Sequence, residues 1–447
     1  MSPARRPPKP REVPGLTRPR RPRLPSVAER VLPNGLRVVA VRRASVPLVQ
    51  LRMRIPTAVR RDADLARVVL LQRSMLLGTA ERTQGELAEA LQRIGGSLRV
   101  YADADGLAMA GDSLGHELSA LLGLAGEVLT SSSYPRSAVE READRLADAL
   151  RRALSQPGVV ADEAWRRRAF GSHPYGRELP TPDDVLGVPA SSMRAAHRRR
   201  VGPDGALLVL VGDLRPARAL DLVERAWAGW TSGGSGSRVP SVPALEPGPL
   251  VLVDRPGAVQ SNLRLGGPAP SRSDPTYPAA EVANALFGGY FSSRLVTNIR
   301  EDKGYTYSPY SMVNHAAAAS WLTIAAEVAT EVTAPALVET SYELGRMASL
   351  PPSADEVEAT AQYLVGSIAL STATQAGLAD TLLDLLTDGQ DVSWLREHPQ
   401  RLAAVTPEQV HEASVALLGP GGLVTAVVGD ADLVEGSLAA LGAVARA

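Results

Sequence analysis

Residues 287–311 read FGGYFSSRLVTNIREDKGYTYSPYS, and this stretch carries most of the information in the chain. A glycine pair opens it, and a charged segment follows whose spacing is typical of a helix. Gly304 is expected to end that helix, because glycine readily takes the left-handed conformation found there. The tyrosine-rich remainder, residues 305–310, predicts a strand.

Two arginines of the expected helix point in different directions. At 100° per residue, Arg294 and Arg300 lie about 600° apart, so they are not expected to share one role. Arg300 ends the helix one turn and one strand before Tyr307, which lets a guanidinium and a phenol meet from adjoining elements. A plainer alternative remains open, in which Arg300 only offsets the C-terminal helix dipole and the tyrosines are half-buried strand residues.

The pattern SSRLxxxIRExKGYxYS within this stretch resembles the signature of the C-terminal half of the M16 (pitrilysin or insulinase) metallopeptidase family, in its processing-peptidase-like subfamily M16B. The resemblance extends over most of residues 27–435. It implies that Arg300 and Tyr307 match the arginine and tyrosine that hold the carbonyl region of the scissile peptide in that family. It also implies two similar halves that face each other like a clamp.

Length and composition indicate an ordinary globular chain. It has 447 residues, a net charge of zero and no cysteine, so disulfides, thiolate zinc sites and cysteine nucleophiles are excluded. Residues 1–26 hold seven Arg, one Lys, one Glu and eight Pro, which predicts a disordered basic arm. No membrane span or secretory signal is recognisable, and we expect a cytoplasmic protein.

The rest of the chain divides into two repeats. The segment LVLVDRPGAVQSNLRLGG (250–267) resembles VVAVRRASVPLVQLRMRI, and GLVTAVVGDADL (422–433) resembles ALLVLVGDL (206–214), with an offset of about 215 residues in both places. Strands and helices cluster rather than alternate, so each repeat is predicted to be α+β. The expected domains are 27–230 and 249–447, joined at 231–248 by a linker of small, polar and Pro-rich composition that has nothing to bury.

The zinc motif of the family is missing. The resemblance implies HxxEH on the first long helix, where two His bind zinc and the Glu is the general base. The equivalent helix here is LARVVLLQRSMLLGT. Anchored on its final Gly-Thr, the motif falls on Val69, Gln72 and Arg73, and one gap moves it to Leu70, Arg73 and Ser74. Neither register supplies a metal ligand.

No other metal site is predicted. Where the family has its further liganding Glu, the helix at 138–154 offers Ala147 or Asp148, and its remaining charges are expected to be solvated. No histidine has a second histidine three or four residues away; the six are His116, His173, His197, His315, His398 and His411. His173, in HPYGRE, is predicted to have a capping or loop role rather than a metal role.

The retained pair and the missing zinc motif together predict a function. We expect the non-zinc-binding subunit of a heterodimeric M16B peptidase, with no cofactor in this chain and zinc in a partner that has an intact HxxEH motif. Arg300 and Tyr307 would bind the scissile carbonyl of a peptide substrate. The glycine-containing loop before the helix is predicted to admit the substrate backbone, or alternatively to be a plain turn. Its residues are Gly288, Gly289, Tyr290 and Phe291.

Two other function classes remain open. The chain could be a scaffold or peptide-binding protein that kept the fold and lost catalysis. Nucleic-acid binding through the basic arm has the least support, because the folded part has no excess of basic residues. The sequence does not identify the peptide substrate.

Overall fold

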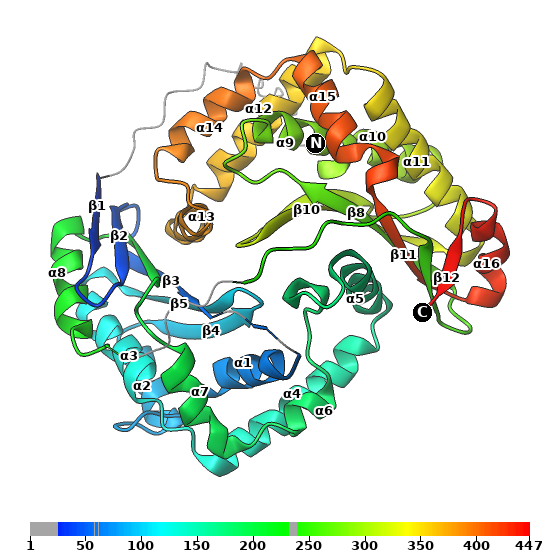
Figure 1. Cartoon of the computed structure of the whole chain (residues 1–447). Coiled ribbons are helices and arrows are strands. Elements are labelled where there is room, and N and C mark those ends of the chain that lie inside the picture. Colours follow the sequence, from blue (N-terminus) through cyan, green and yellow to red (C-terminus); the bar gives the residue numbers. More distant parts are fainter. Residues whose placement is uncertain (1–25, 58, 61, 232–238) are drawn as a thin grey trace, which may run out of the picture.

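The structure, a computed structural model, describes residues 26–57, 59–60, 62–231 and 239–447. Two halves follow each other in sequence, and each contains one six-stranded sheet with its own helices (Figure 1). All of the predicted basic arm except residue 26 lies outside the described residues.

The N-terminal half begins with a β-hairpin and ends with a helix. Its strands are β1 (Ser26–Val31), β2 (Arg37–Arg42), β3 (Leu48–Pro56), β4 (Ser97–Asp103), β5 (Gly106–Leu114) and β6 (Leu207–Gly212). Its helices are α1 (Asp62–Ser74), α2 (Gln84–Arg93), α3 (Leu118–Ser131), α4 (Arg136–Leu154), α5 (Pro157–Phe170), α6 (Pro182–Leu186), α7 (Met193–Arg200) and α8 (Pro216–Trp227).

The C-terminal half uses the same kinds of element in a similar order. Its strands are β7 (Leu250–Asp254), β8 (Gln260–Ala269), β9 (Tyr310–Ala316), β10 (Ala319–Ala329), β11 (Val424–Gly429) and β12 (Val444–Arg446). Its α-helices are α9 (Tyr277–Asn284), α10 (Arg294–Val296), α11 (Thr333–Ser349), α12 (Ala354–Ser371), α13 (Gln375–Thr387), α14 (Trp394–Ala403), α15 (Pro407–Leu418) and α16 (Ala431–Ala439). Two π-helical turns, η4 (Ala285–Gly289) and η5 (Thr297–Asp302), flank α10.

The two sheets share one strand plan. Their orders are β1-β2-β6-β3-β5-β4 and β12-β7-β11-β8-β10-β9. The pairs β2–β6 and β7–β11 are parallel, and the strands that follow in each order are antiparallel. The predicted α+β class and the internal duplication are therefore confirmed. Only the first strand differs, because β1 pairs antiparallel with β2 whereas β12 runs parallel to β7.

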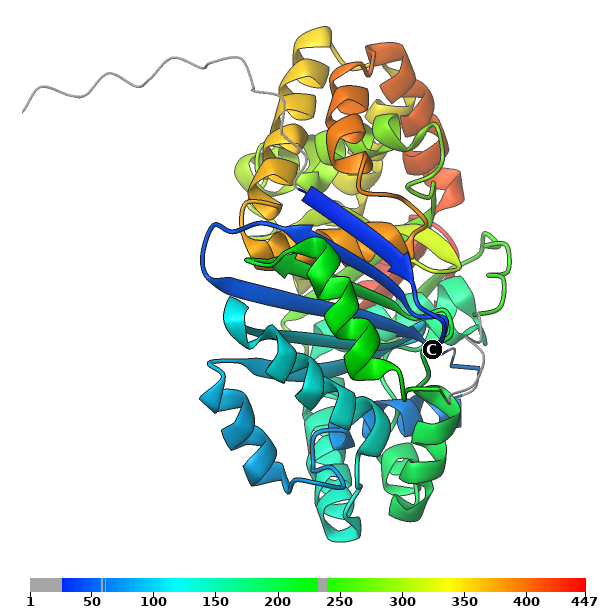
Figure 2. The ribbon, with the colours of Figure 1, turned by 90° about the vertical axis from the view of Figure 1, so that its left-hand side faces the viewer.

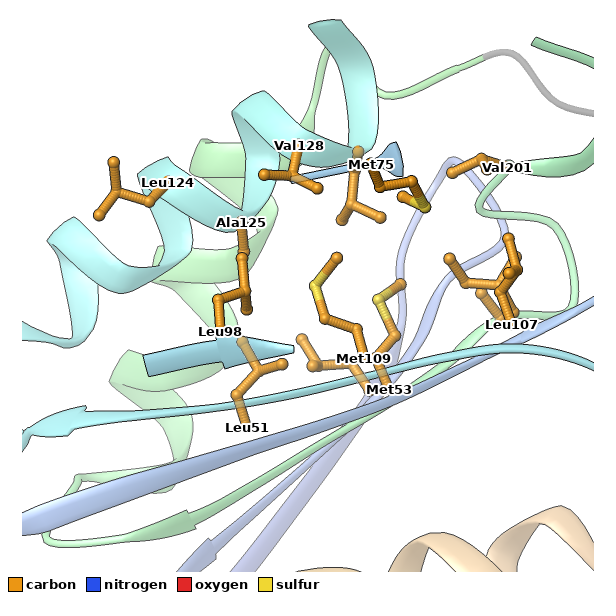
Figure 3. Packing of buried hydrophobic residues seen from close by; sticks show 14 of the residues in the cluster. Leu51, Met53, Met75, Leu98, Leu107, Met109, Leu124, Ala125, Val128 and Val201 are labelled. Carbon is orange, nitrogen blue, oxygen red and sulfur yellow. The ribbon is translucent and has the colours of Figure 1, made fainter. Parts of the chain in front are cut away.

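One face of the N-terminal sheet forms a conventional core with its own helices. Figure 3 shows Met53 and Met109, from β3 and β5, beneath Ala125 and Val128 of α3, and all four side chains are essentially inaccessible. Such burial is the main favourable contribution to folding, at about 25 cal/mol per Å² of apolar surface.

The opposite face of each sheet is covered by a helix from the other half. Helix α13 of the C-terminal half places Leu378, Leu382 and Leu386 against valines of β2 and β6. Helix α5 of the N-terminal half places Trp165 against Val424 of β11, and the Trp165 indole N–H donates to the Val424 carbonyl at 3.2 Å. Figures 1 and 2 show the halves closing on these two helices, which gives the predicted clamp.

Equivalent ion pairs accompany this exchange of helices. Arg52 of β3 pairs with Asp380 of α13, and Arg264 of β8 pairs with Asp162 of α5 at 2.5 Å. Both arginines are buried, at 8% and 4% exposure. Arg52 lies beside Val209 of β6 in the first sheet, and Arg264 lies beside Ala426 of β11 in the second. The duplication thus extends to the contacts between the halves.

The hairpin tips of the two sheets also meet. Asp105, at the β4–β5 turn, accepts a hydrogen bond from the Ala317 backbone N–H at the β9–β10 turn, at 2.9 Å. The Tyr175 hydroxyl donates to Asp105 at 2.6 Å and accepts from the Ala318 N–H at 3.0 Å. Burial, together with Asp105, raises the pKa of Tyr175, so this phenol stays protonated.

The predicted linker is more than a spacer. Residues 239–248 have no regular structure, but Val239, Val242 and Leu245 pack against the cluster that contains Trp165. The expectation of a spacer without buried side chains is therefore wrong for this segment. Among the described residues, no helix has the length and apolar content that crossing a membrane requires.

Candidate functional site

The segment singled out by sequence folds as two π-helical turns around a short α-helix. Gly304 ends it in the left-handed conformation at φ +66°, and its N–H donates to the Arg300 carbonyl at 3.1 Å. The predicted helix stop is confirmed. The predicted strand is not, because β9 begins only at Tyr310, and residues 305–309 form an irregular loop. Residues 305–309 are not part of the strand because the pairing of β9 with β10 ends at Tyr310 and Ala325.

The two arginines have separate partners, as their angular separation predicts. Both Nε and Nη2 of Arg294 donate to one oxygen of Glu356 in α12, at 3.3 and 2.9 Å. Arg294 therefore ties the segment to a neighbouring helix. The Arg300 side chain, 25% exposed, pairs only loosely with its neighbour Glu301, at 3.3 Å.

Arg300 lies among aromatic rings. Its guanidinium carbon lies over the Phe291 ring, 4.5 Å from the centroid, and over the Tyr307 ring, 4.9 Å from the centroid. The two aromatic residues are 62% and 80% exposed, so neither belongs to the core. Arg300 and Tyr307 do meet from adjoining segments, but the contact is made by the ring face. Such contacts contribute about 0.5–1 kcal/mol each at exposed sites.

Gly288 and Tyr290 of the predicted loop face the protein itself. A Cβ on Gly288 would lie 2.7 Å from the Ser311 Cβ, so close packing against β9 accounts for the glycine. The Tyr290 ring packs on Tyr363 of α12, with 4.8 Å between centroids. Gly289 is exposed. Contact of this loop with a substrate backbone stays a prediction.

The duplicated plan shows what is particular to the second half. In the first half, Gly95 ends α2 with φ +60°, and its N–H donates to the Gln92 carbonyl. This hydrogen bond spans three residues, whereas the hydrogen bond between Gly304 and Arg300 spans four, and the residue that accepts it is an exposed, neutral glutamine. Strand β4 begins two residues after Gly95, whereas β9 begins six residues after Gly304. The additional loop is where Tyr307 lies.

The position expected for zinc holds an ion pair instead. The Arg73 Nε atom of α1 lies 2.9 Å from the Glu142 carboxylate of α4 in an ion pair, and the Glu142 side chain is only 11% exposed. Arg145 adds a second contact to Glu142 at 3.2 Å. A guanidinium already satisfies this carboxylate, so the residues present do not fit a zinc ion.

Sequence reasoning missed the role of Glu142. The charges of α4 were expected to be solvated, and this one is not, because Val139, Ala143 and Leu146 form the buried face on which Glu142 also lies. Its spacing of three residues from Val139 and four from Leu146 was the available signal. Ala147 is buried, and Asp148 forms an exposed pair with Arg151.

Several of the histidines have structural partners. His173 caps its turn by accepting from the Tyr175 N–H, and its other ring nitrogen lies 3.1 Å from the Pro240 carbonyl, as a capping role predicts. His398 is fully buried against Glu281, at 2.6 Å. Burial, with Arg272 nearby, lowers the pKa of His315 to about 4. Within the part of the chain that the structure describes, no group of three His, Asp or Glu side chains is placed to hold a metal.

Comparisons with known proteins agree with this architecture. Residues 188–364 match the family model described as the Peptidase M16 inactive domain. The chain is similar to an uncharacterized zinc protease of Mycobacterium leprae, with 25% identity over 64% of this chain and 66% of that protein. An uncharacterized zinc protease of Streptomyces coelicolor is 23% identical over 88% of each chain.

A solved structure extends the match to nearly the whole fold. The crystal structure of a peptidase M16 inactive domain from Pseudomonas fluorescens superposes with a TM-score of 0.82 at 21% identity, and covers 90% of this chain and 98% of that one. The chain therefore matches the M16 peptidase inactive domain over residues 188–364, and it has the fold of a solved M16 structure over 90% of its length.

Proposed function

We propose that this chain is the subunit without zinc in a two-chain zinc peptidase of the M16B type, and that it supplies Arg300 and Tyr307 to bind the scissile peptide. The observation that carries the proposal is the position of the Arg300 guanidinium over the exposed rings of Phe291 and Tyr307. The Arg73–Glu142 pair on α1 and α4 supports the second part of the proposal, which is that a partner with an intact HxxEH motif holds the zinc.

In this proposal Arg300 acts on the carbonyl oxygen. Its N–H groups donate to that oxygen as it gains negative charge during attack by water, and the Tyr307 hydroxyl donates from the other side of the loop. The peptide would bind in extended form by strand addition inside the clamp, where β4 and β9 are the edge strands of the two sheets. The chain itself holds no cofactor in this scheme.

A catalytically silent scaffold is the second candidate. The description of the matching model as an inactive domain favours it. That match spans residues 188–364, however, which include Arg300 and exclude α1 and α4. We favour the peptidase subunit because a scaffold gives no reason for an arginine whose only ion pair among the described residues is the loose one with Glu301. A cytoplasmic location, and the absence of nucleic-acid and membrane partners, remain parts of the proposal.

The test is hydrolysis of an internally quenched peptide mixture, with zinc, by this chain, by an HxxEH-bearing M16 chain of the same genome, and by both together. We expect turnover only in the mixture. Replacing Arg300→Ala in the mixture should lower kcat by roughly 100- to 1,000-fold, the usual cost of losing one oxyanion donor.

The matched control is Arg401→Ala, an exposed arginine of α14 that pairs with Glu397 on the same helix. It should leave turnover unchanged and confirm that charge loss alone is harmless. If the HxxEH chain alone is as active as the mixture, this chain is a scaffold or regulator. If the mixture is active and Arg300→Ala is too, the assignment of Arg300 is wrong.

A further inference from the structure

The contacts of Arg300 leave its hydrogen-bond donors available. A guanidinium has five N–H donors, which lie in its plane, and stacking on a ring uses the face of the group and not its edge. Arg300 lies over two rings, and the only ion pair that involves it among the described residues is the 3.3 Å contact with Glu301. The two rings thus orient the Arg300 guanidinium, and no carboxylate occupies most of its N–H donors.

Arg294 shows the contrasting case six residues earlier. There Glu356 accepts from two nitrogens and holds the side chain as a structural ion pair. The pKa of Glu356 is lowered in part by this arginine, although its burial acts in the opposite direction. A carboxylate partner therefore both occupies the donors and neutralises the charge. Aromatic partners do neither, which suits a group that must still bind an acceptor.

The two aromatic residues before the SSRL motif have divided roles. Tyr290 turns toward α12, where its ring packs on Tyr363 and its hydroxyl lies 3.4 Å from the Thr360 hydroxyl. This contact anchors the loop. Phe291, the next residue, is 62% exposed and contributes to no core cluster of the described residues. Its ring contacts Arg300, and that contact is the interaction that accounts for an exposed phenylalanine here.

We propose that Phe291 is a positioning residue, whose ring orients the Arg300 guanidinium toward a peptide carbonyl while leaving its N–H donors free. This inference rests on the proposed peptidase function. Phe291 does not itself touch the reacting atoms. Its effect on turnover passes through Arg300, and it should disappear when Arg300 is absent.

The experiment uses the two-chain mixture and the quenched peptides. Phe291→Leu keeps an apolar side chain and removes the π face, so kcat should fall by roughly two- to fivefold, the equivalent of one exposed cation–π contact, with KM nearly unchanged. Phe291→Tyr keeps the ring and should restore kcat. Tyr342→Leu is the control, because Arg346 lies over that exposed ring at 5.6 Å, remote in sequence from the site.

A double-mutant cycle distinguishes positioning from other roles. In an Arg300→Ala mixture, Phe291→Leu should have no further effect on kcat. An equal loss in both backgrounds, an increase in KM alone, or no loss at all would each overturn the inference. Those outcomes leave the peptidase function standing, whereas an inactive wild-type mixture would remove both proposals together.

Discussion

At position 73, the side chain decides what kind of site the first half has. Arg73 forms an ion pair with Glu142, and this contact joins α1 to α4 across the place where the family resemblance implies a metal site. A guanidinium and a buried carboxylate provide a bond between the helices that needs no metal.

Arg73→Ala tests this linking role. The mutation leaves the buried Glu142 with Arg145 alone, and we expect the free energy of unfolding to fall by about 1–2 kcal/mol. The value lies below that of a fully buried pair because Arg73 is 43% exposed. Denaturant unfolding measures the change. Arg151→Ala, which breaks an exposed pair on the same helix, should change it by less than about 0.5 kcal/mol.

The absence of the zinc motif could be predicted from single residue identities. The ion pair that occupies its place could not. Val69, Gln72 and Arg73 are not zinc ligands in any fold, so the sequence alone excludes the motif. Glu142 as the partner of Arg73 depends on how α1 and α4 pack, and that is a tertiary property. The contact between Arg300 and Tyr307 was predictable because the two residues lie on adjoining segments. The contact of the Phe291 ring with Arg300 was not, because it depends on tertiary packing.

At the scale of elements, the segment from η4 to β9 is held by close backbone contacts. Gly288 lies against Ser311, and the Ser311 hydroxyl donates to the Asn284 side chain. Asn284 in turn donates to the Ser311 carbonyl at 3.4 Å. The π-helical turns add backbone to a helix at this point, a feature often found at functional sites.

Gly288→Ala should destabilise the protein by about 1–3 kcal/mol, because the new Cβ would lie 2.7 Å from the Ser311 Cβ, which cannot move away easily. Gly345→Ala is the matched control. That glycine is in α11 with no atom within 4 Å of an added Cβ, and helix propensity predicts a gain of up to about 1 kcal/mol. Equal effects of both substitutions on thermal unfolding would contradict the packing argument.

Helix ends were the most predictable elements. Thr83 and Glu86 have the sequence spacing of a capping box and form one at the start of α2, and Gly304 ends η5 as expected. These signals are local and depend on a few neighbouring residues. The start of β9 was predicted too early because strand limits depend on the partner strand, here β10, which follows later in the sequence.

At the scale of the whole molecule, the halves are coupled by the helices they exchange. Arg52 and Arg264 are buried in the two sheets, and each depends on an aspartate from the other half. Removing the aspartate would leave a buried guanidinium without its main partner, which is more costly than losing an exposed pair.

Asp380→Ala and Asp162→Ala should therefore each lower the free energy of unfolding by about 1–3 kcal/mol. Because the sheets share α5 and α13, we expect both mutations to shift one common calorimetric transition. Glu140→Ala, which breaks an exposed pair with Arg136, is the control. Two transitions, each moved by only one of the mutations, would show that the halves unfold independently.

The duplication was predictable because both repeats preserve their strand sequences, and the clamp was expected from the resemblance to the M16 family. The exchange of α5 and α13 was not, since nothing in an amphipathic pattern tells which sheet a helix will cover. The linker was predicted to be a spacer from its Pro-rich composition, yet Val239, Val242 and Leu245 pack on the Trp165 cluster.

The exchange of helices has a consequence for synthesis on the ribosome. The apolar face formed by β2 and β6 is complete once residue 212 has emerged, but α13, which covers it, begins only at Gln375. Throughout the intervening translation, Val39, Val209 and Val211 have no covering helix. During this period the nascent chain exposes the apolar face of β2 and β6, which favours aggregation. Protection by chaperones therefore matters most at this stage.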